Sequence, residues 1–284
     1  MPHVEHLTTP WPYRQDLYNG QDPTDFLINE LEATIARIGA TKIAAMVGEP
    51  IMGVGGMLIP PDDYWTRVQE VLRKHGILLI FDEVVTGFRI GPGGAQQNLG
   101  IRADLVTYGK ALGGGWPVGA VGGRAEVMAG VDGGVWQYGD ESAPQGLRTY
   151  FAGTTCKHPL VMAAVGAVLD YIIAHGDEMY TELNKKARRL SSSLNQWWDD
   201  QGYALRILHY GSQFRFHVPA DIAMVFFQTL NLNGVYCWEG RTCYLFTTHT
   251  DADIDRIIAA VKRTTLTLID HGAALPTTLE SIAP

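Results

Sequence analysis

Cysteine is scarce in this chain, whose 284 residues include only Cys156, Cys237 and Cys243. Three cysteines are too few, and their spacing is too irregular, for a disulfide framework or for a zinc site. We therefore expect no bound metal. The low cysteine content also fits a reducing, cytoplasmic setting.

Positive charge is in deficit, because 22 lysine and arginine residues stand against 30 aspartate and glutamate residues, which gives a net charge of −8. The basic residues form no long run along the sequence. Nonspecific binding to nucleic acid needs a basic face, and binding to an anionic membrane surface needs a basic cluster. We expect neither kind of partner.

Long apolar segments are missing as well. Residues 1–14 lack the basic-then-apolar layout of a signal peptide, and no apolar run approaches the ~20 residues that span a bilayer. The most apolar stretch, residues 160–176, has the length of a helix and few polar side chains. We therefore expect a helix there that is buried in the core.

Glycine, by contrast, is abundant, with 32 residues, many of them between positions 48 and 153. In the first half of the chain, apolar strands alternate with amphipathic helices, the first of which has Thr24 as its expected N-cap. Strands are expected over residues 42–50 and 76–84 and within residues 101–109, at DLVTY, and helices over residues 24–38, 61–76 and 124–130. This order predicts an α/β fold with a mostly parallel sheet and helices on both faces.

The second half of the chain has a different rhythm, in which short strands predominate after about residue 203. Helices are expected over residues 160–176, 177–200, 220–234 and 251–272, and strands within residues 204–211, 212–218, 234–240 and 241–248. We therefore predict two domains. Residues 1–185 form the large α/β domain, and residues 186–284 form a smaller C-terminal α+β domain.

Polar residues follow the predicted parallel strands at Glu49, at Asp82 and Glu83, and at Lys110. Sites in parallel α/β sheets form outside the carboxyl ends of the strands, so these side chains are the candidates for chemistry. A buried carboxylate is costly without a partner, and one interpretation is a structural ion pair between Asp82 and Lys110. The alternative is a pyridoxal phosphate site, which needs a lysine for a Schiff base and an aspartate at the ring nitrogen.

Three motifs decide between these interpretations: IFDEVVTGFR at residues 80–89, DLVTYGKALGGGWPVGAVGGR at residues 104–124 and YFAGTTCKHPLVMAA at residues 150–164. In this order and spacing, they resemble the class III aminotransferases of the fold type I pyridoxal phosphate enzymes. Within that class the chain is similar to glutamate-1-semialdehyde aminomutases and to the aminotransferase domains of assembly lines. Its opening is more similar to omega-amino-acid and amine transaminases.

The resemblance implies a set of cofactor-binding positions. Lys110 matches the Schiff-base lysine, Asp82 the partner of the pyridine nitrogen, and Val84 the apolar residue against the ring. Glu49 matches a glutamate near the cofactor. Thr154 matches a threonine that reaches the cofactor phosphate of a neighbouring subunit, which implies a homodimer with shared sites.

The activity implied is the transfer of an amino group from an amino donor to a keto acid, aldehyde or β-ketoacyl compound. An aminomutase reaction on an amino-aldehyde is the first alternative. Arg241 could contact a substrate carboxylate and Glu239 a substrate amine, although a solvated turn is the other interpretation of both. Cys156 and His158 are expected to have packing and capping roles.

Two departures from the family matter. Many members carry a glutamate that masks a substrate-binding arginine, and Val54 stands at the corresponding position. The family's N-terminal portion, with its loop around the cofactor phosphate, has no counterpart before Glu49. The sequence is then a fragment, or is completed by a separate N-terminal chain or domain, or is a truncated non-catalytic dimer partner.

Overall fold

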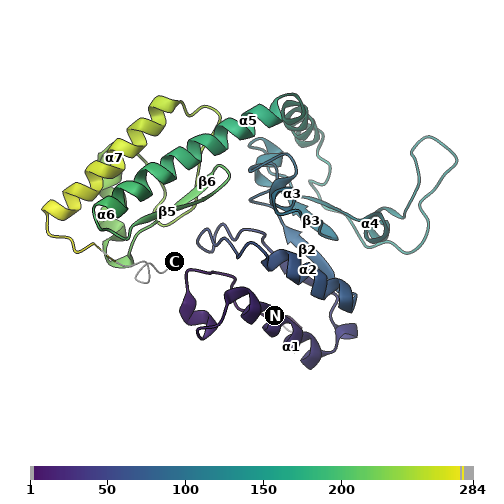
Figure 1. Ribbon diagram of the computed structural model, residues 1–284. Coiled ribbons are helices and arrows are strands. Elements are labelled where there is room, and N and C mark those ends of the chain that lie inside the picture. The colour runs from purple at the N-terminus through teal and green to yellow at the C-terminus, as the bar shows by residue number, and fades with distance from the viewer. Residues whose placement is uncertain (1–2, 276, 278–284) are drawn as a thin grey trace.

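A four-stranded sheet forms the centre of the first half of the chain in the computed structural model, which describes residues 3–275 and 277 (Figure 1). Its strands, in spatial order, are β1 (Ala45–Gly48), β2 (Leu78–Asp82), β3 (Leu105–Tyr108) and β4 (Ala120–Gly123). Neighbours β1, β2 and β3 are parallel, and β4 is antiparallel to β3. The predicted α/β fold with a mostly parallel sheet is confirmed.

Two helices, α1 (Pro23–Ile38) and α2 (Tyr64–His75), pack against each other and form one apolar cluster with this sheet. The short 3₁₀ helices η1 (Gln15–Tyr18) and η2 (Ala40–Lys42) flank α1. The N-cap of α1 is Asp22, whose side chain accepts a hydrogen bond from Asp25 N, so the expected cap at Thr24 is wrong. Thr24 instead donates to Asp63 Oδ1 at 2.8 Å, which joins the starts of the two helices.

Shorter helices follow β2, β3 and β4 along the chain. They are the helix α3 (Gly94–Leu99), the 3₁₀ helix η3 (Lys110–Gly113) and the helix α4 (Ala125–Asp132). The chain from residue 133 to residue 158 then contains neither helix nor strand, and a long loop projects from the body of the molecule in Figure 1.

One helix of 42 residues, α5 (Pro159–Asp200), replaces the two helices expected over residues 160–200. Gly176 does not end the first of them, because its φ angle is not positive and the helix continues through it. A glycine inside a helix costs about 1 kcal/mol relative to alanine, which tertiary packing can offset. As Figure 1 shows, α5 therefore reaches from the large sheet to the C-terminal part of the chain.

The first part of α5 corrects two expectations, one about the length of its apolar segment and one about its burial. Residues Pro159–Gly176 are long and apolar enough to cross a membrane, by length and composition alone, with a mean hydropathy of 1.5. Gly166, Asp170 and His175 interrupt the apolar residues of this segment, so the sequence did not predict an apolar segment of this length. Only 6% of this segment is buried, so the prediction of a buried core helix is wrong for the described chain.

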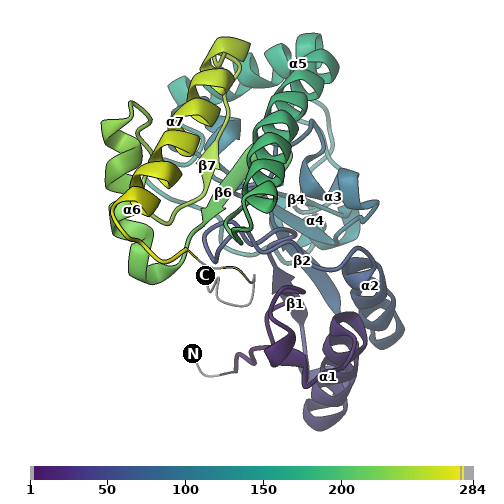
Figure 2. The ribbon, with the colours of Figure 1, turned by 60° about the vertical axis from the view of Figure 1, so that its left-hand side comes forward.

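The C-terminal part has its own three-stranded antiparallel sheet, visible in Figure 2 beside α5 and α7. Its elements are β5 (Arg206–Tyr210), β6 (Gln213–His217), α6 (Ala220–Leu232), β7 (Cys243–Tyr244) and α7 (Asp251–Asp270). Strand β6 lies in the middle of the sheet. The strand expected over residues 234–240 is wrong, since the structure has turns and irregular backbone there.

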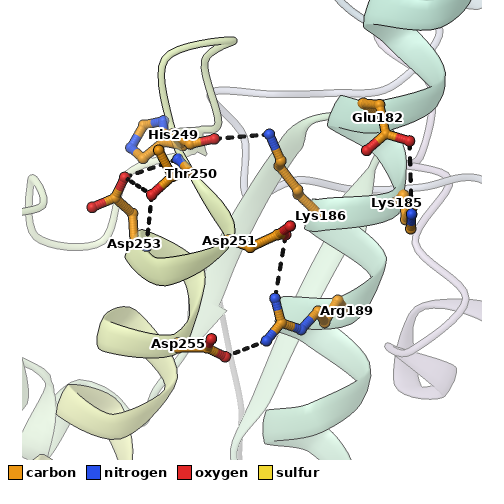
Figure 3. A network of polar contacts seen from close by, with 9 residues as sticks. All are labelled: Glu182, Lys185, Lys186, Arg189, His249, Thr250, Asp251, Asp253 and Asp255. Carbon is orange, nitrogen blue, oxygen red and sulfur yellow. Dashed lines mark hydrogen bonds and ion pairs between the residues drawn. The ribbon is translucent and has the colours of Figure 1, made fainter.

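Polar contacts fix the start of α7 against α5 (Figure 3). Thr250 and Asp253 form a reciprocal capping box at the first turn of α7. From α5, Lys186 Nζ donates to His249 O at 2.8 Å, and Arg189 pairs with Asp251 at 3.3 Å and also with Asp255. Acidic residues in this first turn are therefore used for capping and ion pairs, and no metal-ligand cluster is found among the described residues.

Two apolar clusters support the predicted division of the chain. One joins residues between 18 and 106, and the other joins residues between 183 and 268. The predicted boundary between residues 185 and 186 falls inside α5. It stays a prediction, with α5 shared by both parts.

Candidate active site

Three strand ends bring the predicted polar residues to one edge of the large sheet. Glu49 directly follows β1, Asp82 ends β2, and Lys110 follows β3 as the first residue of η3. The parallel register pairs Gly48 with Phe81 across β1 and β2, so the ends are level. The charges of Asp82 and Lys110 both act on the Glu49 carboxyl group, as expected if the three lie together.

Two donors hold one oxygen of the Asp82 carboxylate. Val84 N lies 2.9 Å from Asp82 Oδ1, and Thr107 Oγ1 lies 3.2 Å from the same atom. The sequence analysis missed Thr107. The register could have revealed it, because Thr107 pairs with Asp82 across β2 and β3. The two donors fix the orientation of the Asp82 carboxylate.

Lys110 is exposed and its backbone has a φ angle of 43°, in the left-handed region that side chains rarely adopt. Within residues 3–275, no hydrogen bond and no ion pair within 4.0 Å holds its ammonium group. The alternative of a buried structural ion pair with Asp82 therefore has no support. A strained backbone that presents a free amine is typical of a functional position.

Glu49 is half-buried and bonded to the loop that follows it. Its Oε2 accepts from Gly53 N at 3.1 Å. The pKa of Glu49 is raised, and burial is the largest cause. The nearby charge of Asp82 also raises this pKa, whereas the Gly53 N–H and the charge of Lys110 lower it. Gly53 O in turn accepts from Thr242 Oγ1 at 2.7 Å, which ties this loop to the C-terminal part of the chain.

Val84 and Glu83, which follow Asp82, point in different directions. Val84 is partly exposed and packs against the backbone before Lys110, where a Cβ on Gly109 would lie 3.3 Å from Val84 Cγ1. Glu83 is fully buried and accepts from Ala95 N at 2.6 Å and Gln96 N at 3.0 Å. Glu83 is therefore a structural cap of α3.

Three predicted residues are not brought to Lys110 within this chain. Thr154 is exposed in the long loop before α5, and no contact of its side chain is described. Glu239 and Arg241 are exposed in the turn between α6 and β7, where the Arg241 guanidinium lies 5.1 Å from the Trp238 ring centroid. The neighbour of Arg241, Thr242, does reach the Glu49 loop.

A half-buried cation, Arg89, was not anticipated as a contact between the two parts of the chain. Its Nε donates to Val85 O at 3.0 Å, and its guanidinium carbon lies 4.2 Å from the Tyr244 ring centroid. Burial lowers its pKa. Ser212 Oγ donates to Arg89 O, and Tyr180 Oη donates to Phe88 O. The TGFR segment, residues 86–89, is therefore anchored both to the β5–β6 turn and to α5.

Hollows in the surface do not coincide with these residues. Two, of about 230 and 360 Å³, lie along α5, one around His175 and Lys186 and the other beside Pro92 and Ile173. Neither is lined by Asp82 or Lys110. The candidate site is defined by the three strand ends that converge at Glu49, Asp82 and Lys110. It lies on an uncovered part of the sheet, where no facing element among the described residues encloses a hollow.

Known proteins share the sequence pattern of this chain. The family model for class III aminotransferases matches residues 1–264. A glutamate-1-semialdehyde 2,1-aminomutase of Archaeoglobus fulgidus is 31% identical over 262 residues, which cover 84% of this chain and 59% of the relative. The corresponding protein of Methanocorpusculum labreanum is 36% identical over 237 residues, which cover 78% of this chain and 53% of the relative.

Solved structures agree. An (S)-enantioselective omega-transaminase of Thermomicrobium roseum has a TM-score of 0.78 and 29% identity, and the match covers 95% of this chain and 61% of that enzyme. An amine transaminase from an uncultivated Pseudomonas species, solved with bound pyridoxal phosphate, has a TM-score of 0.78 and 26% identity, covering 92% and 61%. This chain thus spans little more than half the length of those curated relatives, and it belongs to the class III aminotransferase family.

Proposed function

We propose that the protein is a pyridoxal-phosphate-dependent aminotransferase that uses Lys110 as its cofactor-binding lysine. The observation that carries this proposal is the free Lys110 ammonium group at a strand end beside Asp82 and Glu49. A structural lysine in such a place would be paired with one of the two carboxylates. Family membership supports the same assignment.

The residues present fit the ring end of this cofactor. Asp82 Oδ1 is held by two donors, so the carboxylate is fixed in direction and could accept a hydrogen bond from the N–H of a pyridinium ring. Val84 offers a partly exposed apolar surface beside it. When bound, pyridoxal phosphate supplies an aldehyde that captures amines and a ring that withdraws electrons.

In this proposal the chain's own groups perform proton transfer and orientation. Once the substrate amine has displaced it, the Lys110 Nζ amine would take the proton that leaves the carbon of the amino donor, and in the second half of the reaction it would deliver a proton to the acceptor carbon. Asp82 would hold the ring nitrogen through a hydrogen bond to its carboxylate. Glu49 positions the loop after β1 through Gly53 N, close enough to the site for its charge to matter.

The substrates we propose are a small amino donor and a keto acid, aldehyde or β-ketoacyl acceptor. Arg241 is proposed to meet a substrate carboxylate and Glu239 a substrate amine, because Thr242 ties their turn to the loop after Glu49. Val54, which is 66% exposed on that loop, cannot act as the charged mask found in other members.

A second candidate activity is that of an aminomutase, which moves the amino group within one molecule. It is favoured by the names of the curated relatives, all glutamate-1-semialdehyde 2,1-aminomutases among those compared. The two activities differ in whether a second molecule must accept the amino group. Product formation from an amino-aldehyde alone would select the aminomutase.

Assembly and location belong to the same proposal. We propose a homodimer in which Thr154 reaches the cofactor phosphate of the neighbouring subunit, since this exposed residue has no contact described within its own chain. A cytoplasmic location is supported by the three cysteines, which are all free thiols.

The decisive experiment compares Lys110→Ala with the wild-type chain after addition of pyridoxal phosphate. We expect the wild-type chain to gain visible absorbance and to transfer amino groups, and the variant to lose the absorbance and about 10²–10⁴-fold of the rate. Lys185→Ala is the matched control, because Lys185 is 75% exposed on α5. Unchanged turnover in the Lys110 variant would refute the mechanism. A colourless wild-type chain would favour the non-catalytic partner.

A further inference from the structure

Two of the three cysteines lie next to each other in space, on either side of a turn in the C-terminal part. Cys237 precedes the turn at residues 238–242, and Cys243 begins β7 directly after it. The chain reverses between them through a backbone hydrogen bond of 3.2 Å and through Gly240, whose φ angle is 59°. A side-chain hydrogen bond joins the two thiols. They are therefore in contact, and both are free thiols in the structure.

The C-terminal core holds this pair in place. Both side chains are partly buried and pack against the apolar cluster of that part of the chain. Cys243 pairs with Phe214 across β6 and β7, and its Sγ lies 3.7 Å from Arg241 O. The fold thus fixes the two sulfur atoms near each other, while partial exposure leaves them open to a small reagent. The third cysteine, Cys156, is exposed in the long loop before α5.

Arg215 on β6 places a positive charge beside the pair. Its Nε is buried and has no hydrogen-bond partner in the part of the chain that the structure describes. Burial and the charge of Arg241 lower the pKa of Arg215, whereas the charge of Cys243 acts in the opposite direction. A guanidinium that no carboxylate neutralises stabilises a nearby thiolate.

The two thiols differ in acidity. The hydrogen bond from Cys237 and the charge of Arg215 lower the pKa of Cys243, although burial opposes them. The same hydrogen bond and burial raise the pKa of Cys237. The thiolate is the nucleophile in thiol–disulfide exchange, so Cys243 is the attacking sulfur and Cys237 is the resolving one. An acidic thiol beside a protonated thiol is a reactive arrangement, whereas buried structural cysteines are inert.

We propose that Cys237 and Cys243 form a redox-active dithiol, which a low-molecular-weight disulfide oxidises to an intramolecular disulfide. The Cys243 thiolate attacks one sulfur of the small disulfide, so that a mixed disulfide forms and the first small thiolate leaves. The Cys237 sulfur then loses its proton and attacks Cys243 Sγ, which breaks the mixed disulfide and releases the second small thiolate. The two protons lost by the protein thiols are taken up by the two small thiolates. The protein dithiol is oxidised, and the small disulfide is reduced to two thiols.

The disulfide closes a ring of residues 237–243 around the turn. Bonded sulfur atoms are about 2.05 Å apart, so the two sulfurs must approach each other from hydrogen-bonding distance. Thr242, the neighbour of Cys243, donates to Gly53 O at 2.7 Å. Closing the ring therefore restricts the turn and, through this hydrogen bond, the loop after β1. The inference concerns the redox state of the turn and holds whether or not the chain transfers amino groups.

The test treats the 284-residue chain with oxidised glutathione and identifies the products by mass spectrometry of peptides. We expect a disulfide between Cys237 and Cys243, with two glutathione thiols released for each one formed. Cys237→Ser should stop at the mixed disulfide on Cys243, because the resolving sulfur is missing. Cys243→Ser should react about tenfold or more slowly, because the remaining thiol is the less acidic one. Both variants should keep the circular dichroism of the wild-type chain.

Cys156→Ser is the matched control, because Cys156 is exposed and lies outside the pair. This variant should form the Cys237–Cys243 disulfide at the wild-type rate. The proposal is overturned if the wild-type chain keeps both thiols, or if it stops at a mixed disulfide on Cys243. It is also overturned if Cys156 forms a disulfide with either member of the pair in place of the expected bond.

Amide hydrogen exchange tests the effect on the turn. Exchange in residues 238–242 should slow by about threefold or more on oxidation and recover after reduction with dithiothreitol. Exchange in residues 50–58 should slow as well, and Thr242→Val should form the disulfide without this second effect. A disulfide that leaves exchange in residues 238–242 unchanged would overturn the proposed restriction of the turn.

Discussion

The two sheets of this protein differ in how completely the chain covers them. In the C-terminal sheet, four of the five residues of the middle strand β6 are buried, on both faces. In the N-terminal sheet, the central strand β2 buries only alternate residues. The C-terminal sheet is thus covered on both faces by its own chain, whereas the N-terminal sheet is covered on one face only.

This difference teaches where the stability and the chemistry of the chain are located. The closed C-terminal sheet has a complete apolar core around Trp198, Phe226 and Leu245. The open sheet carries Asp82 and leads into Lys110. We expect the C-terminal part to be the more stable one when the chain is isolated, and the predictions below test this contrast.

The largest expected effect is that of Phe226→Ala. Phe226 is fully buried, with its ring centroid 5.4 Å from that of Phe227 and 5.9 Å from that of Phe216. Truncation should cost about 3–5 kcal/mol of unfolding free energy. Hydrogen exchange in increasing urea should show the loss in β5–β7 and no comparable loss in β1–β3. Phe246→Ala, at a ring that is 55% exposed, is the control and should change little. Equal losses in both sheets would mean one cooperative unit.

A pH effect of similar size is expected from His217 on β6. The pKa of this histidine is lowered to about 4, mainly by burial and also by the nearby charge of Arg215, while contact with the Gly56 backbone acts in the opposite direction. The unfolded chain binds a proton on this residue near pH 6.5, so stability is complete above that pH and falls toward pH 4. The loss approaches about 3 kcal/mol.

His217→Phe should flatten this part of the stability curve, measured by urea unfolding between pH 4 and pH 7. His6→Gln, at an exposed histidine, should leave the curve as it is in the wild-type chain. A curve for His217→Phe with the wild-type slope would show that the histidine is not held neutral in the fold.

A smaller effect is expected at the contact that joins the two parts. Thr242→Val removes the 2.7 Å hydrogen bond to Gly53 O with little change in shape. The loss should be about 1 kcal/mol, and exchange should quicken in residues 50–58. Thr248→Val, at an exposed threonine, should have no such effect. If exchange in the loop is unchanged, Thr242 does not hold the segment after Glu49.

The smallest expected effect is that of Arg189→Met on α5. Arg189 is paired with Asp251 and Asp255 at the surface, where such pairs contribute about 0–1 kcal/mol. Thermal unfolding should show a slight loss at low salt that disappears at about 1 M salt. A loss that persists in salt would show that packing of the arginine stem, and not its charge, fixes α7 to α5.

Much of the N-terminal fold follows from local sequence. Apolar runs bounded by glycine and proline located β1, β2 and β3 within a few residues, and Gly76 ends α2 with a left-handed φ angle of 67°. The strand ends also predicted the convergence of Glu49, Asp82 and Lys110. These features depend on periodicity and on turn chemistry, which a single sequence carries.

Other features depend on tertiary structure. Gly176 was expected to end a helix, but α5 continues through it. Residues 234–240 have strand-like composition, but no neighbouring strand pairs with them in the described structure. Thr242 and Arg89 act across the junction of the two parts, at a sequence distance that no local pattern reports.

The continuity of α5 has a mechanical consequence. From Gly176 to Asp200 the helix adds about 37 Å of length at 1.5 Å per residue. A bend of about 10° at Gly176, the least restrained point of the helix backbone, would carry the far end through about 6 Å. A small change of angle near the large sheet is thus amplified into a larger displacement at the C-terminal end of α5. A slight bend there would move β5 and α7, which pack on the far part of α5, relative to the large sheet.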